Sequence, residues 1–257
     1  MCRWMTYAGP AIYLEKLIYE PENSLVRQSL SARRARTPTN GDGSGIGWYA
    51  ERNVPGLYRE TRPAWNDPNL RSLAHQIRSR LFFAHVRAST GTAASIANCH
   101  SFAHRRWMFM HNGQIGGYER VRRALDARIP DDVYNARVGT TDSEAFFYLL
   151  FAHGLDSDPV GALAKTVALV VETMSQAGTD EPFRMTAALT DGETLYALRY
   201  STDPDPPTLF YVREAEKLIV VSEPLDADET NWAPVANGHV LVARNGGAPT
   251  IRAFRAD

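Results

Sequence analysis

The order of the patterned segments is the strongest constraint on the fold of this chain. Residues up to about 115 alternate short apolar runs with turns, residues 118–178 carry helical patterns, and residues from 183 onward return to short strand patterns. Regular alternation of strands and helices would predict parallel βαβ units, whereas segregated strands and helices predict an α+β protein. We therefore expect sheets covered by separate layers of helices.

Two continuous apolar runs, Leu81–Val86 and Trp107–His111, predict strands that are buried on both faces. The second run is followed by Asn112-Gly113, a dipeptide typical of tight turns, so we expect the strand to end there. In the last third of the chain, Asp191-Gly192 lies between two strand patterns and predicts a hairpin. The strands expected there are 185–189, 194–200, 209–212, 218–221 and 240–244, with a further one at 46–50.

Capping signals place the two main helices. Thr141 with Glu144 three residues later matches a capping box, and apolar residues after it predict one buried face. Asp158-Pro159 begins a longer helix that we expect to end near Gly178. Further helices are expected over residues 23–32, 68–80 and 118–128.

Charge and cysteine content exclude several classes of protein. The 28 basic and 29 acidic residues give a net charge of −1, which argues against a nucleic-acid or anionic-membrane partner. We find neither a long apolar run nor a leader pattern, and the two cysteines, Cys2 and Cys99, fit a reducing compartment, so we expect a cytoplasmic protein. The seven histidines form no complete ligand pattern, and we expect no metal and no cofactor.

Cys2 is the first residue with a chemical interpretation. Removal of Met1 would leave a cysteine whose thiol and α-amine supply a nucleophile and a base within one residue. The α-amine has an ordinary pKa near 8, so part of it is neutral near pH 7. A cysteine at position 2 also occurs by chance in unrelated proteins, so Cys2 alone does not assign a function.

Three other positions each have two interpretations. Arg87 follows a buried strand and is either a surface residue or a fork that binds a carboxylate. Asn112-Gly113 is either a turn or an oxyanion hole made of a side-chain amide and a backbone N–H. Asp142 either stabilises its helix N-terminus electrostatically or holds a substrate ammonium group. The glycines between residues 41 and 47 do not match a phosphate-binding loop and instead predict a tight loop before a strand.

In chain order, these segments resemble the class II glutamine amidotransferases of the N-terminal-nucleophile hydrolase superfamily, in particular their stand-alone subgroup. The matching segments are Met1–Arg3, Asn40–Trp48, Ala84–Ser89, Asn98–Phe102, His111–Ile115, Thr141–Glu144, Ser222–Leu225 and Trp232. The resemblance covers nearly the whole chain. It implies one amidotransferase domain over residues 1–257, which starts at Cys2 once Met1 is removed.

The resemblance also implies a four-layer αββα sandwich and a role for each matching residue. Cys2 would be the nucleophile and, through its α-amine, the base. Arg87, with Thr90 as a second residue, would bind the α-carboxylate of the substrate, and Asp142 would bind its α-ammonium group. Asn112 and Gly113 would form the oxyanion hole. Such a set suits glutamine or a γ-glutamyl compound, which carries both charges at one end and an amide at the other.

Two departures from the family pattern bear on function. Ser101 stands where the family often has proline, and we expect no synthase domain after the matching segments. Three hypotheses therefore stay open. The protein is a free-standing hydrolase of γ-glutamyl amides, like relatives that act on ergothioneine precursors or glutathione-type peptides; or a glutaminase subunit that passes ammonia to a separate synthase; or a non-catalytic binding module. The four intact site residues argue against the last.

Overall fold

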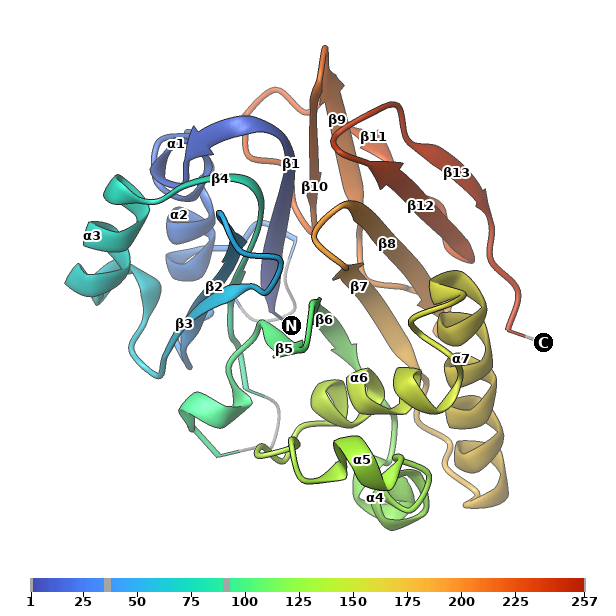
Figure 1. Ribbon diagram of the computed structural model, residues 1–257. Helices are drawn as coiled ribbons and strands as arrows, with labels where there is room; N and C mark the ends of the chain where they lie inside the picture. Colours follow the sequence, from blue (N-terminus) through green and yellow to red (C-terminus); the bar gives the residue numbers. More distant parts are fainter. Residues whose placement is uncertain (1, 35–37, 90–92, 257) are drawn as a thin grey trace.

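The computed structural model describes residues 2–34, 38–89 and 93–256 (Figure 1). Two antiparallel sheets pack face to face, and helices cover the outer face of each sheet. Helices α1–α3 pack on the first sheet and α4–α7 on the second (Figure 1). This arrangement confirms the α+β class and the four αββα layers expected from the sequence.

The first sheet has the strand order β11-β9-β10-β1-β4-β2-β3. Its strands are β1 (Arg3–Tyr13), β2 (Ser44–Tyr49), β3 (Gly56–Glu60), β4 (Arg78–Val86), β9 (Phe210–Glu214), β10 (Lys217–Val221) and β11 (Ala233–Pro234). The second sheet has the order β13-β12-β8-β7-β6-β5. Its strands are β5 (Phe102–His104), β6 (Trp107–Gln114), β7 (Arg184–Thr190), β8 (Thr194–Ser201), β12 (His239–Arg244) and β13 (Thr250–Ala253).

The helices divide between the two outer layers. They are α1 (Glu15–Ile18), α2 (Leu25–Leu30), α3 (Pro68–Gln76), α4 (Tyr118–Asp126), α5 (Asp131–Tyr134), α6 (Asp142–Ala152) and α7 (Pro159–Gln176), with short 3₁₀ turns at Ala64–Asn66 and Ile96–Asn98. Three apolar clusters fill the spaces between neighbouring layers, and the middle cluster lies between the two sheets. Because side chains alternate along a strand, the even-numbered residues of a central strand enter the cluster on one face of its sheet, and the odd-numbered residues enter the cluster on the other face.

The expected turn at Asn112-Gly113 is wrong. Strand β6 continues to Gln114, and Asn112 and Gly113 pair with Thr186 and Met185 of β7. A Cβ atom on Gly113 would lie 1.9 Å from the Arg184 carbonyl oxygen, so the glycine permits a close approach of two strands rather than a turn.

Two helix predictions also need correction. The helix expected over residues 68–80 ends at Gln76, because Ile77 is extended and β4 starts at Arg78. In α6 the Thr141 side chain accepts from the Glu144 N–H as expected, but the Glu144 carboxylate accepts from the Val138 and Gly139 N–H groups rather than closing a capping box. Helix α6 is also buried nearly all round, not on one face, because α4, α5 and α7 enclose it against β6.

Candidate active site

Cys2 immediately precedes the first central strand of the first sheet. Its thiol lies 3.4 Å from the Ala88 backbone nitrogen and 3.5 Å from the Ala88 carbonyl oxygen, just beyond the end of the neighbouring strand β4. Trp4 pairs with His85 and its side chain belongs to the cluster between the sheets. By strand alternation, Cys2 lies on the same side as Trp4 and faces the second sheet.

The surroundings of the Cys2 thiol have opposing effects on its ionisation. Burial raises the pKa of the thiol above its ordinary value, and the Ala88 backbone hydrogen bond and the charges of Arg87 and Arg3 oppose that shift. The net direction is upward, so the thiol is mainly protonated near neutral pH. Because the thiolate is the nucleophilic form, reaction at this cysteine requires a base close by.

Arg87 is buried directly beside this position. Its guanidinium donates to the Asp42 carbonyl at 3.2 Å and to the Ser89 hydroxyl at 3.2 Å. The Asp42 carboxylate in turn accepts from the Ser89 N–H at 2.7 Å. The loop that precedes β2 therefore holds both the guanidinium and the chain that follows it. Thr90, the second residue expected at this subsite, lies outside the described residues.

Asn112 approaches from the opposite sheet. Its side chain is 1% exposed, and neither its amide nitrogen nor its amide oxygen has a hydrogen-bond partner among the described residues. The Trp4 indole donates to the Thr186 hydroxyl at 3.2 Å, and that hydroxyl donates to the Asn112 carbonyl at 3.3 Å. This chain of contacts places Asn112 across the inter-sheet space from the start of β1. An unpaired buried amide is costly, and such groups are typical of binding and catalytic sites.

Asp142 lies at the start of α6 and is tied to the end of β6. Its carboxylate accepts from the backbone N–H of Ile115 at 2.8 Å and from that of Ser143 at 2.8 Å. His111 of β6 adds a second link, because the Ser143 hydroxyl donates to Nδ1 of its ring at 2.8 Å and Nε2 donates to the Arg184 carbonyl at 3.1 Å. The carbonyl can only accept, which assigns this tautomer. Burial lowers the pKa of His111 and keeps the ring neutral.

Two more histidines lie behind the site. His85 and His100 are buried and stacked with 4.2 Å between ring centroids, and their ring nitrogens have no hydrogen-bond partner in the described ranges. Burial lowers the pKa of His85 to about 3 and that of His100 well below its ordinary value. Ser101, the departure from the family pattern, is itself buried next to His100 and follows a cis peptide bond. The loop is therefore packed even without the proline.

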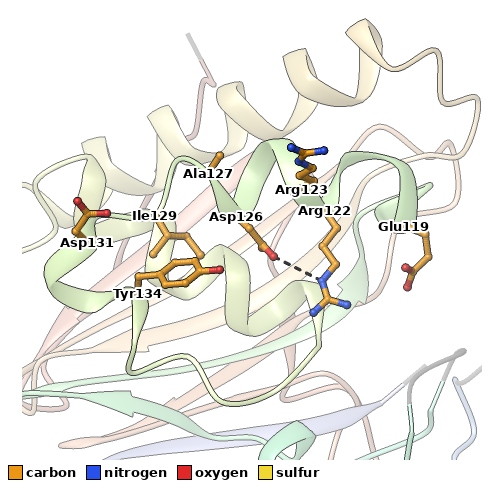
Figure 2. A pocket seen from close by; sticks show the side chains of 8 residues that line it. All are labelled: Glu119, Arg122, Arg123, Asp126, Ala127, Ile129, Asp131 and Tyr134. Atoms are coloured by element: carbon orange, nitrogen blue, oxygen red, sulfur yellow. Dashed lines mark ion pairs between the residues drawn. The ribbon is translucent and has the colours of Figure 1, made fainter.

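A surface pocket of about 490 Å³ lies elsewhere, between α4 and α5 in the outer helical layer (Figure 2). Arg122 points toward Asp126, with 3.6 Å between Nε and Oδ2. None of the predicted site residues lines this pocket. Within the described part of the chain, no group of three or more histidine, cysteine or acidic side chains could hold a metal ion, and no helix is long and apolar enough to cross a membrane.

The geometry thus brings Cys2 and Arg87 together where the central strands β1 and β4 of the first sheet begin and end. Asn112 and Gly113 lie at the facing end of β6, and Asp142 is tied to that end through Ile115. Four other residues that shape the site were not predicted individually from the sequence. Asp42 and His111 lay within segments that match the family, so their segments, but not their contacts, carried a signal. Trp4 and Thr186 carried no local signal, because their role depends on contact between the two sheets.

Similarity to known proteins identifies the family. A family model described as class-II glutamine amidotransferases matches residues 20–216. A probable glutamine amidotransferase of Saccharomyces cerevisiae is 32% identical over 95% of this chain and 82% of the relative. A gamma-glutamyl-hercynylcysteine sulfoxide hydrolase of Mycolicibacterium smegmatis is 28% identical over 95% of this chain and 96% of the relative.

Solved structures give the same result. A glutamine aminotransferase class-II domain protein from Silicibacter pomeroyi has a TM-score of 0.79 and 40% identity over 98% of this chain and 99% of that chain. Glutamine phosphoribosylpyrophosphate amidotransferase from Bacillus subtilis has a TM-score of 0.70 at 13% identity, and the match covers 100% of this chain and 50% of that chain. At this identity the likeness supports the fold alone. The chain belongs to the class-II glutamine amidotransferases.

Proposed function

We propose that this protein hydrolyses the γ-glutamyl amide bond of glutamine or of a γ-glutamyl compound through a thioester on Cys2. The observation that carries the proposal is the placement of the Cys2 thiol against Ala88, next to the buried guanidinium of Arg87. Two of the similar proteins are, by their names, a glutamine amidotransferase and a γ-glutamyl hydrolase, and both names support cleavage of this bond.

Each site residue then has one task. Arg87 binds the α-carboxylate of the substrate and Asp142 its α-ammonium group, and together they hold the γ-amide against the thiol. Once Met1 has been removed, the α-amine of Cys2 takes the thiol proton, and sulfur attacks the γ-carbonyl carbon. The Asn112 amide and the Gly113 N–H stabilise the oxyanion. The amine or ammonia leaves with a proton, and water hydrolyses the thioester to release glutamate.

Glutamate release from a panel of substrates tests this function. Purified protein whose loss of Met1 is confirmed by intact mass is incubated with glutamine and with γ-glutamyl dipeptides, beside the Cys2→Ala variant. We expect turnover without a partner and a loss of about 10,000-fold or more in Cys2→Ala. The Cys99→Ala variant is the matched control, because it removes the other cysteine of the chain, and it should keep most of the activity.

The pattern of substrates also separates the hypotheses that remain. Strong release from dipeptides and little from glutamine would support the free-standing hydrolase and contradict an ammonia donor. Weak glutamine turnover that a separate synthase stimulates would favour the glutaminase subunit. Full activity in Cys2→Ala would refute the proposed chemistry.

A further inference from the structure

A buried ion pair lies on the side of β1 that faces away from the candidate site. Arg3 is 1% exposed and Glu223 is fully buried, with 3.2 Å between Nε of the arginine and Oε2 of the glutamate. Arg3 also donates from Nη1 to the Cys2 carbonyl oxygen at 3.1 Å. One guanidinium therefore joins Glu223 to the main chain of Cys2.

Cys2 needs such an anchor because it precedes the strand. The paired residues of β1 begin with Arg3, opposite Val86 of β4. On the β10 side of β1, Ser222 holds Trp4. The Ser222 hydroxyl accepts from the Trp4 N–H at 2.9 Å, and the Ser222 N–H donates to the Trp4 carbonyl at 3.0 Å. Ser222 and Glu223 thus hold two consecutive parts of the chain that leads to Cys2.

Glu223 is itself held in one position by several donors. Its carboxylate accepts from the Arg33 N–H at 3.0 Å, the Arg34 N–H at 2.8 Å and the Asn23 side-chain amide at 3.2 Å. These groups come from the two ends of the α2 segment: Asn23 precedes the helix, and Arg33 and Arg34 follow it. A carboxylate with this many partners has little freedom, so it fixes the position of the negative charge that the Arg3 guanidinium faces at 3.2 Å.

We propose that Glu223 is a positioning residue for Cys2, which acts by holding Arg3 against the Cys2 carbonyl. The inference rests on the proposed function, in which Cys2 is the nucleophile. Rotation of the Cys2 peptide group would move the α-amine and the thiol relative to Arg87 and Asn112. A displacement of about 1 Å in such a site can lower the rate about 100-fold.

Stability alone is the competing explanation of this pair. Buried ion pairs are weak evidence for stability, since well-packed neutral replacements are often equally stable, whereas removal of one partner leaves an uncompensated charge. Two variants separate the explanations. Arg3→Lys keeps the charge but lacks the fork that reaches Glu223 and the Cys2 carbonyl together. The double variant Arg3→Met with Glu223→Gln removes both charges and keeps an amide oxygen that can accept from one of the two N–H groups of Arg33 and Arg34.

The test measures kcat and KM for glutamate release, with folding checked by thermal unfolding. In Arg3→Lys and in the double variant, we expect kcat to fall about 10- to 100-fold, KM to change less than about threefold, and the protein to remain folded. The matched control is Glu229→Gln, which removes the exposed partner of the Arg34 side chain and leaves Glu223 in place. It should retain the wild-type kcat.

The result that would overturn the proposal is a folded Arg3→Lys or double variant whose kcat lies within twofold of the wild type. Cys2→Ala is assayed in parallel to keep the two proposals distinct. Loss of activity in Cys2→Ala combined with wild-type kcat in the Arg3 variants would refute the positioning role alone. Full activity in Cys2→Ala would instead refute the proposed function.

Discussion

The two ends of the space between the sheets differ sharply in chemistry although the same strands line both. One end is filled with apolar side chains, and the other holds buried polar groups and the thiol. The change occurs along alternate residues of three segments: Leu81, Phe83, His85 and Arg87; Met108, Met110 and Asn112; and Ala8, Trp4 and Cys2, with the polar Thr6 between Ala8 and Trp4 as an exception. The polar ends of β1, β4 and β6 therefore coincide, and the site is built where they meet.

The difference shows how one fold divides stability from chemistry. Burial of an apolar side chain contributes about 1.5–3 kcal/mol to stability. A buried polar group without a partner instead costs about 1–3 kcal/mol, and His85, His100 and Asn112 all carry such atoms. The apolar end therefore offsets the cost of the polar end. We expect variants at the apolar end to change the free energy of unfolding and variants of site residues at the polar end to change kcat.

Phe83→Ala, at the apolar end, should have the largest effect on stability. Phe83 is fully buried between the sheets. Removal of a buried phenyl ring costs about 3–5 kcal/mol, through lost burial and the cavity left behind. Urea unfolding measures this loss, and kcat of the folded fraction should stay near the wild-type value. A Phe83→Ala protein that loses kcat without losing stability would contradict the division between the two ends.

Asn112→Ala, at the polar end, should act on the reaction instead. Loss of one oxyanion donor lowers kcat about 100- to 1,000-fold, and KM should change little because the donor acts in the transition state. The free energy of unfolding should not fall, because the lost amide has no protein partner in the described structure. Met110→Leu, two residues back on the same face of β6, is the matched control and should leave kcat unchanged.

His85→Gln should change how stability depends on pH. The pKa of His85 is about 3 in the folded protein and ordinarily about 6.5 in an unfolded chain, so only the unfolded state takes up this proton between those values. The free energy of unfolding of the wild type therefore falls with decreasing pH across this range. From pH 7 to pH 5, His85 should account for about 2 kcal/mol of the loss.

Urea unfolding at the two pH values checks this expectation. The His85→Gln variant, which cannot take up that proton, should lose about 2 kcal/mol less than the wild type. The control Met110→Leu changes the same inter-sheet space without removing a titratable group and should keep the wild-type pH dependence. Equal pH dependence in His85→Gln and the wild type would contradict the cost assigned to the polar end.

Local patterns predicted most elements because their causes are local. The Thr141 and Asp158 side chains cap α6 and α7 as expected, and Asp191-Gly192 joins the β7–β8 hairpin. The prediction failed at Asn112-Gly113, where the dipeptide favours a turn but pairing with Thr186 and Met185 keeps it in β6. Long-range strand pairing outweighs a local turn preference of this size.

The sequence by itself determined the α+β class through its periodicity and the family through motifs in fixed order, and the resemblance to that family implied the four layers and the residues proposed for the site. Only the tertiary structure decided which residues support them. Glu223 lies about 220 residues from Arg3 along the chain, and Thr186 lies 182 residues from Trp4, yet each pair is in contact. Contacts between distant segments depend on how the sheets pack and leave no periodic signal in the sequence.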